Sequence, residues 1–300
     1  MRTVGEMGED GLIARLCGGL ASHDEVVVGP GDDCAVVGKG EVLSLLKTDA
    51  VVAGVHFLVE EEARRVGWKA VGRVLSDFAA MGGEPGELLV TLAMAPEVAV
   101  SWVEELYDGM KDCLAKHGGV VVGGETTSLP AGSPTMISVA GRGRVRRKDL
   151  VTRSRGKPGD GIYVTGRLGG SLAGKHLDFI PRLAEARWLV RNHALSAMMD
   201  LSDGLAKDLP RLARASGVGF DLAAGAVPCA EGVEVAGALG DGEDYELLFT
   251  SPDEIGSAWT KEFPDLELTR VGRLVEGPGE DLAGGWEHFR PAGDAPTSSA

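Results

Sequence analysis

The stretch "VVVGPGDDCAVV", Val26 to Val37, sets two adjacent carboxylates, Asp32 and Asp33, between two apolar runs typical of β-strands. Adjacent like charges repel, and charges beside apolar strands lose hydration, so the arrangement costs free energy unless something compensates. The stretch therefore predicts two strands joined by a segment that carries either a bound cation or a hydrogen-bonded acid.

The composition indicates a large globular chain with two domains. Its 300 residues are 44% apolar, which is enough for one large or two ordinary hydrophobic cores. Aromatic residues make up only 5%, whereas glycine occurs 45 times, which favours many tight turns over an aromatic-rich sandwich. We expect an α/β fold built from mixed sheets (α+β in part).

Charge and apolar patterning exclude several partners. The net charge is −15, so nucleic acid is a poor partner. No run of about eighteen apolar residues is present and the first ten residues lack the features of a signal peptide, so we expect no membrane partner and a cytoplasmic location. The four cysteines are widely spaced in apolar contexts, which favours core thiols over disulfides or a zinc site.

In the first half of the chain, the hydrophobic periodicity predicts a sheet covered by helices. One helix carries Val71, Val74, Leu75 and Phe78 at helical spacing. The expected helices span about 11–20, 63–81 and 98–117, and the expected strands span 25–28, 34–37, 42–52, 87–95, 119–122 and 136–145.

The second half repeats this pattern after the basic run "RGRVRRK" and the turn "RGKPGDG". We place the boundary near 145–151, which gives an N-terminal domain of residues 1–147 and a C-terminal domain of residues 148–300. Pro210 is expected to kink the helix that contains it, and the polar tail from about 291 is expected to be disordered. The expected helices span 171–177, 182–194 and 202–216, and the expected strands span 162–165, 218–222 and 245–250.

The segment "GGSLAGKH", Gly169 to His176, matches the phosphate-loop pattern GxxxxGK and follows a strand. His176 replaces the Ser or Thr whose hydroxyl would hold magnesium in such a loop. A glycine-rich turn is therefore the favoured interpretation, because such turns are frequent in a chain with this much glycine.

Two acids stand inside apolar patterns. Asp77 lies three residues after Val74 and four before Met81, on the stripe that should face the core. Asp49 ends a strand-like run, seven residues before His56. The structural alternatives are a buried hydrogen-bonded acid at 77, a bulge or edge strand at 49 and a structural histidine at 56.

Three further acids occur at predicted element ends. Glu125 follows the strand "VVVGGE", although a hairpin turn would explain it equally. Asp200 and Asp203 flank Ser202 at the start of a predicted helix, where Ser and Asp are common N-caps. N-capping does not explain Asp200, which precedes the cap.

Asp33, Asp49, Asp77, Glu125, Asp200 and Asp203 thus place oxygen ligands on separate strand ends and helix starts. Mg²⁺ uses one or two carboxylates together with substrate phosphates, so this many acids predict several ions that bridge a polyphosphate such as ATP. Phosphoryl transfer needs positioning and charge neutralisation, so no catalytic side-chain nucleophile is required.

Eight segments in fixed order resemble the thiamine-monophosphate kinases, a family within the aminoimidazole ribonucleotide synthetase-like superfamily. They run from about residue 29 to 289 as "GPGDDCAVV", "KTDAVVAGVHF", "VLSDFAAMGGEP", "VVVGGETT", "RSRGKPGDGIYVTG", "MDLSDGLAKDL", "GEDYELLFT" and "GWEHF". The resemblance implies a two-domain fold, with an N-terminal domain that binds ATP and magnesium and a C-terminal domain that completes the active site. It also implies a homodimer whose N-terminal sheets form a barrel, and transfer of the ATP γ-phosphoryl group to thiamine monophosphate.

The resemblance also implies roles for individual residues. Several Mg²⁺ ions would be held by Asp33, Thr48, Asp49, Asp77, Glu125, Asp200 and Asp203, with a possible contribution from the Lys47 backbone. ATP would contact Tyr107, Gly124, Arg153 and Ser202. Thiamine monophosphate would contact His56, Glu243 and Trp286, and a Trp face against a cationic thiazolium ring is physically favourable.

Three positions depart from the family pattern. Glu125 stands where Asp is usual, Lys47 where Ser or Thr is common, and Asp241 where Gly is usual. Two alternatives therefore stay open: another ATP-using enzyme of the superfamily, or a non-catalytic protein that binds nucleotide or metal. The tail "PTSSA" lacks the cysteine of a hydrogenase-maturation enzyme, and "GVHF" and "GWEHF" favour the thiamine branch.

Overall fold

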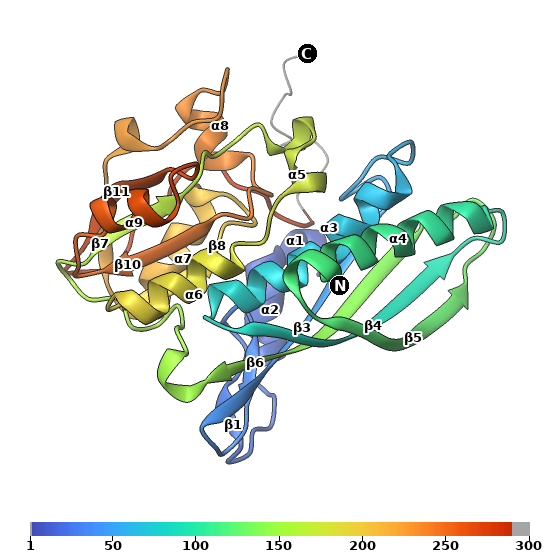
Figure 1. Ribbon diagram of the computed structural model, residues 1–300, viewed down its shortest axis with the longest axis horizontal. Coiled ribbons are helices and arrows are strands. Elements are labelled where there is room, and N and C mark those ends of the chain that lie inside the picture. Colours follow the sequence, from blue (N-terminus) through green and yellow to red (C-terminus); the bar gives the residue numbers. More distant parts are fainter. Residues whose placement is uncertain (1, 290–300) are drawn as a thin grey trace.

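The computed structural model describes residues 2–289 and contains two β-sheets with helices packed on them (Figure 1). The mixed α/β fold class is as predicted. The tail from about 291, predicted to be disordered, lies outside the described residues. Among those residues, no helix combines the length and apolar sequence needed to cross a bilayer.

The N-terminal sheet has six strands, and helices cover one of its faces (Figure 1). β4 and β5 run parallel and are joined by α4 (Val100–His117), while the other pairs are antiparallel. Beside α4 lies α3 (Ala63–Ala80). In spatial order the strands are β1 (Val26–Val28), β2 (Ala35–Val37), β3 (Val42–Val52), β6 (Met136–Arg146), β4 (Glu84–Met94) and β5 (Val120–Ser128).

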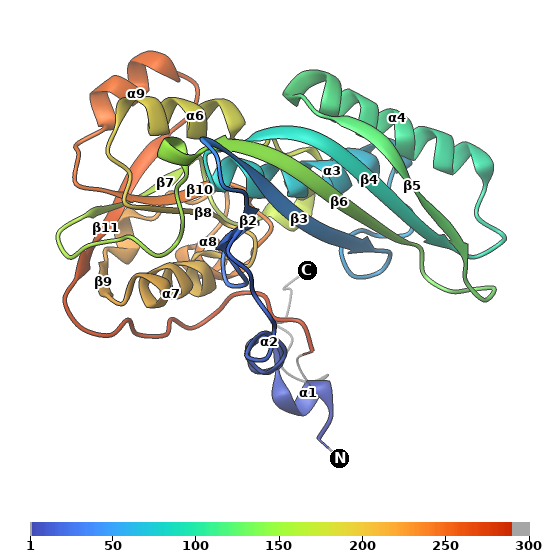
Figure 2. The same cartoon turned by 90° about the horizontal axis from the view of Figure 1, so that it is seen from below.

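The C-terminal sheet has five antiparallel strands. α6 (Leu183–Asn192) and α9 (Gly256–Glu262) cover one face, and α7 (Leu205–Ser216) covers the other (Figure 2). In spatial order the strands are β8 (Ala197–Asp200), β10 (Leu247–Ser251), β7 (Gly161–Thr165), β11 (Leu268–Val275) and β9 (Gly219–Leu222). The remaining short elements are α1 (Val4–Met7), α2 (Glu9–Cys17), α5 (Lys175–Asp178), α8 (Val235–Gly240) and three 3₁₀ turns at 147–149, 171–173 and 224–226.

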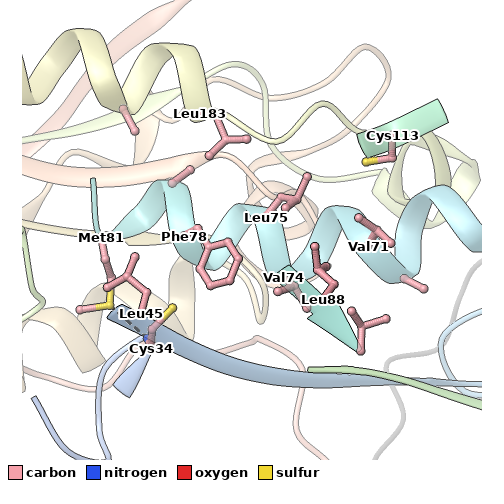
Figure 3. Packing of buried hydrophobic residues seen from close by; sticks show 14 of the residues in the cluster. Cys34, Leu45, Val71, Val74, Leu75, Phe78, Met81, Leu88, Cys113 and Leu183 are labelled. Atoms are coloured by element: carbon pink, nitrogen blue, oxygen red, sulfur yellow. Dashed lines mark hydrogen bonds between the residues drawn. The ribbon is translucent and has the colours of Figure 1, made fainter. Parts of the chain in front are cut away.

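α3 is the central element of the larger core. Figure 3 shows Val74 and Phe78 on this helix beside Leu45 of β3 and Leu88 of β4, with Leu183 of α6 nearby. All five side chains are buried. Because nearly all residues of α3 from Lys69 to Ala80 are buried, a polar residue in this part must find its partners inside the protein.

Two glycines allow α3 and α4 to pack closely. A Cβ atom at Gly109 would lie 1.8 Å from the carbonyl oxygen of Arg64, and one at Gly67 would lie 1.9 Å from that of Leu106. Both neighbours are backbone atoms, so relief requires the helices to move apart. The close approach fixes α3, and with it the charged residues that α3 carries.

We predict that Gly109→Ala lowers the free energy of unfolding by about 2 kcal/mol or more, because overpacking outweighs the helical preference of alanine. Urea denaturation would measure the change. Gly256→Ala on α9 is the matched control, since a Cβ atom there meets nothing within 4 Å. Equal stability of the two variants would contradict the close-packing interpretation.

Several elements differ from the sequence-based expectation. Five elements were not predicted, because each is short or lacks a regular spacing of apolar residues: the strands β8 and β11 and the helices α1, α8 and α9. The expected helix 11–20 is α2, none of whose residues is buried and which projects from the body (Figure 2). Glu125 lies inside β5 rather than after it. Pro210 lies within α7, and the kink expected there stays a prediction.

The prediction of core thiols is right for two of the four cysteines. Cys34 and Cys113 are buried, whereas Cys17 and Cys229 are half-buried. All four are free thiols.

Candidate functional site

Three buried carboxylates from distant parts of the chain meet in one cluster. Asp33 precedes β2, Asp77 lies on α3 and Asp200 ends β8, and each offers an oxygen within 4.8 Å of the other two. Their exposed fractions are 2%, 5% and 3%. Such a set of buried like charges requires compensating positive charge.

Successive side chains of β3 point to opposite faces of the sheet, and this decides which of them reach the cluster. Leu45 and Val51 are buried against α3. Lys47 and Asp49 lie between them at every second position, so their side chains point to the same face. Thr48 points to the opposite, outer face, where its hydroxyl lies 3.4 Å from Ser138 Oγ. The structure thus brings Asp49 to the cluster but places the Thr48 hydroxyl away from it.

Three resident cations pair with the acids. Lys47 Nζ donates to Asp77 Oδ1 at 2.8 Å and lies 3.6 Å from Asp49 Oδ2. Arg73 of α3 donates to Asp49 Oδ1 at 3.2 Å, and Arg153 forms an ion pair with Asp33. Asp200, which has no such cation within residues 2–289, accepts a hydrogen bond from Ser76 Oγ at 2.6 Å.

The pKa shifts reflect a balance between burial and this pairing. At Asp77, burial and the neighbouring acids outweigh the Lys47 charge and raise the pKa well above its ordinary value. Burial, together with the neighbouring Asp33 charge, raises the pKa of Asp200 to about 7. Burial also opposes ionisation of Asp49, but Lys47 and Arg73 outweigh it and hold its pKa below the ordinary value. For Lys47, burial is outweighed by Asp77 and Asp49, so its pKa is raised and the ammonium stays charged.

Asp32 differs from Asp33 in its partners. Its Oδ1 accepts the Asp33 N–H and its Oδ2 accepts the Arg153 N–H, both at 3.1 Å. Burial and the Asp33 charge raise the pKa of Asp32 to about 6. Asp32 therefore stabilises the turn and anchors the Arg153 backbone, while the Arg153 side chain pairs with Asp33.

A pocket beside the cluster collects residues predicted to contact substrate. His56, Glu243 and Trp286 line it together with Ser202 and Asp203. Arg73 also lines this pocket while it holds Asp49, so it connects the pocket with the acid cluster. Burial lowers the pKa of His56 to about 4, so its ring is neutral near pH 7 and its Nδ1 accepts the Val52 N–H.

Glu243 is held by a buried charge network. Lys69 on α3, with an exposed fraction of 0%, donates to Glu243 Oε2, and its Nζ also lies 2.7 Å from His176 Nδ1. Although burial opposes ionisation, the contacts with His176 and Lys69 lower the pKa of Glu243 to about 2. Glu243 has φ 55°, a left-handed conformation that costs free energy in a non-glycine residue and that this network maintains.

The glycine-rich segment 169–176 forms hydrogen bonds with the loop that carries Asp241 and Glu243. Ser171 Oγ donates to the Glu243 carbonyl oxygen, and Gly170 N–H donates to Asp241 at 2.8 Å. His176 supplies the ring beside Glu243. The segment thus positions the Glu243 loop, in agreement with its interpretation as a turn, and Asp241 has a defined hydrogen-bonding role there.

We predict that Lys69→Met lowers the free energy of unfolding by about 3–5 kcal/mol, because it leaves Glu243 without its buried cation. Chemical denaturation would measure the loss. Lys69→Met combined with Glu243→Gln should recover part of it, since the unpaired charge is then gone. A double variant less stable than Lys69→Met would contradict the pairing.

Ser202 and Asp203 do not cap α7. The N-cap is Gly204, and the N–H groups of Ser202 and Asp203 both donate to Asp208 Oδ2. Burial and the neighbouring Asp203 raise the pKa of Asp208 to about 8. Asp208 therefore holds the loop that presents Ser202 and Asp203 to the pocket.

Three predicted site residues lie elsewhere. Tyr107 is on α4, and Gly124 and Glu125 are on the edge strand β5, where Glu125 is exposed. β5 is three strands away from β3, a distance of about 14 Å at the usual spacing, and the register places Glu125 beside outward-facing Thr91. Asp77 of α3 contacts Lys47 on the inner face of β3, so we infer that Glu125 and Asp77 of one protomer do not bind the same ion.

Sequence reasoning missed Lys69, Arg73 and Asp208. Lys69, Arg73 and Asp77 recur every four residues on one side of α3, within its mostly apolar segment 66–80. That spacing of charges is a signal that could have found the first two. Asp208 had no such signal, because its role depends on a loop conformation.

Comparisons with known proteins agree with this arrangement. Residues 31–145 match the AIR synthase related protein N-terminal domain, and residues 165–283 match the C-terminal domain of the same family. These matches place the chain in the class of AIR synthase related proteins. The structure of HypE in complex with ATP is similar in fold alone, with a TM-score of 0.67 at 18% identity, 92% of this chain and 88% of that chain being covered.

Other similarities are more specific. Thiamine-monophosphate kinase of Rhodopirellula baltica is 35% identical over 89% of this chain and 89% of its own length, and that of Escherichia coli is 35% identical over 82% and 83%. The structure of AaThiL complexed with AMPPCP and TMP has a TM-score of 0.84 and 32% identity, covering 96% of this chain and 99% of that chain. The chain belongs to the thiamine-monophosphate kinase family.

Proposed function

We propose that the protein transfers the γ-phosphoryl group of ATP to thiamine monophosphate and produces thiamine diphosphate. One observation carries the proposal: the buried acid cluster adjoins a pocket lined by His56, Glu243 and Trp286, and Arg73 lies where the two meet. The kinases named above and the AaThiL complex with AMPPCP and TMP support the same assignment.

The cluster fits Mg²⁺. Asp33, Asp77 and Asp200 offer only oxygen donors, and they are close enough to share ions, as a hard cation requires. Bound magnesium would neutralise the charge that develops on the transferred phosphoryl group. The Asp203 carboxylate, at the edge of the pocket, extends this acidic surface toward the substrate.

The pocket suits the cationic ring of thiamine. Glu243 stays ionised because its pKa is about 2, so it would pair with the ring's positive charge. The Trp286 face offers a cation–π contact. Ser202, on the loop held by Asp208, and Arg153, beside Asp33, lie where they could contact ATP.

The working unit that we propose is a homodimer. Leu46, Leu89 and Val122 on the first sheet are 41%, 50% and 59% exposed, and a second protomer packed against this sheet would bury them. Within the described residues, β2 pairs with β3 only as far as Leu46, so the half of β3 that carries Asp49 has an open edge. If two sheets close into a barrel, β5 of the partner, with Tyr107, Gly124 and Glu125 nearby, would lie along that edge.

Each half of the chain has its own part in this proposal. Residues 1–147 would bind ATP and magnesium, and residues 148–300 would complete the site through Asp200, Asp203 and Glu243. Use of ATP suits a cytoplasmic enzyme.

A product assay tests the function. Purified protein is incubated with ATP, MgCl₂ and thiamine monophosphate, and thiamine diphosphate is quantified by chromatography. We expect multiple turnovers. Binding of ATP and thiamine monophosphate, measured by calorimetry, without formation of product would instead support a non-catalytic binding protein.

A further inference from the structure

Two side-chain cations already hold one side of the acid cluster. Lys47 Nζ lies between Asp77 and Asp49, and Arg73 donates to the other oxygen of Asp49. Together they supply two positive charges to two carboxylates. A single Mg²⁺ bound between these carboxylates would supply the same charge.

The geometry leaves little space for an additional ion at this position. A divalent ion that bridged Asp49 and Asp77 would lie about 2.1 Å from their oxygens, whereas Lys47 Nζ is 2.8 Å from Asp77 Oδ1. The ammonium and the ion would occupy the same space, and their like charges would repel. Lys47 would therefore have to move away before an ion could bind there.

The backbone limits that movement. Lys47 belongs to the row of β3 that faces α3, and its side chain is only 25% exposed. Arg73 is fixed from the other side, because it also donates to the Ala50 carbonyl oxygen at 3.2 Å, and its side chain is 14% exposed. Among the described residues, the group of three acids whose oxygens lie within 4.8 Å of one another does not include Asp49.

We propose that Lys47 and Arg73 take the place of one divalent cation: they stay between Asp49 and Asp77 when substrate binds, and divalent ions bind only between Asp77 and its two other acidic neighbours, Asp33 and Asp200. This inference rests on the proposed function, because it presupposes that the cluster binds ions with nucleotide. It also assigns a role to Lys47, one of the departures from the family pattern.

The direct test uses the wild-type protein crystallised with Mn²⁺ and AMPPCP. The anomalous signal of manganese locates each ion. We expect peaks beside Asp33 and Asp200, none between Asp49 and Asp77, and Lys47 Nζ still hydrogen-bonded to Asp77. A manganese peak that bridges Asp49 and Asp77, with Lys47 displaced, would overturn the proposal.

Ion counting in solution gives a second, independent test. Electron paramagnetic resonance of free Mn²⁺ measures how many ions bind per protomer with saturating AMPPCP. The variant Lys47→Ser with Arg73→Leu should bind one ion more than wild type, and an equal number would contradict the proposal. Lys39→Ser is the matched control, since Lys39 is exposed and pairs with Asp24 at the surface. If wild type binds no Mn²⁺ at all with AMPPCP, the proposed function itself fails.

Discussion

Asp77→Asn is expected to lower kcat by about 10²- to 10³-fold, the range seen when one preorganised electrostatic group is removed from an active site. Asp77 is the member of the cluster that lies on α3, between the oxygens of Asp33 and Asp200 and the ammonium of Lys47. Asparagine keeps the shape but removes the charge. Steady-state kinetics with saturating MgCl₂ would measure the effect.

The control for this variant is Asp24→Asn. Asp24 is exposed and pairs with Lys39 at the surface, so its neutralisation should leave kcat unchanged. Both variants should show the circular dichroism spectrum of the wild type. A folded Asp77→Asn protein with near-normal kcat would remove Asp77 from the group of residues that bind ions.

A mixture of two inactive variants is expected to regain activity. If Glu125 reaches the acid cluster of the partner protomer, Asp77→Asn and Glu125→Gln damage different halves of each shared site. A heterodimer of the two has one site with both halves intact. Random exchange of protomers should therefore restore about a quarter of wild-type activity, since half of the dimers are mixed and each has one working site.

The two proteins should carry different affinity tags, so that heterodimers can be purified and counted. Self-mixed samples of each variant, taken through the same exchange, provide the baseline. Heterodimers that form in the expected proportion but stay inactive would show that Glu125 acts within its own protomer. A self-mixed Glu125→Gln sample as active as wild type would show that Glu125 has no catalytic role. Sedimentation of the wild-type protein tests the homodimer itself.

The sequence predicted the elements that are long enough to show a repeating pattern of apolar residues. α3 and β3 have strong patterns, because each buries a regular row of apolar side chains against a large core. β8 was not predicted because a four-residue strand has too few positions to establish a period. β11 has eight residues, but its two buried side chains, Val271 and Leu274, are three positions apart and do not alternate. Glu125 was placed after its strand, although β5 continues through Gly123 and Gly124. Gly124 has no Cβ, which lets the backbone of β4 approach closely: a Cβ there would lie 1.9 Å from the Val90 carbonyl oxygen.

For the site, the sequence indicated which residue types matter but not how they pair. Asp77 could be singled out, because an acid on an apolar stripe violates a local rule. Asp33 was predicted to bind metal, whereas the role of Asp32 was left open; in the structure Asp33 joins the cluster while Asp32 holds the turn and the Arg153 backbone. Pairings such as Lys69 with Glu243 join residues far apart in the chain, and no local pattern reports them.

Direct phosphoryl transfer is the central claim, and isotope tracing tests it most directly. ATP labelled with ³²P at the γ position is incubated with the protein, MgCl₂ and thiamine monophosphate, and the products are separated by chromatography. We expect the label to appear in the terminal phosphate of thiamine diphosphate at the rate at which ADP forms. Label that appears only as inorganic phosphate, or that stays in ATP while both ligands bind, would contradict the claim.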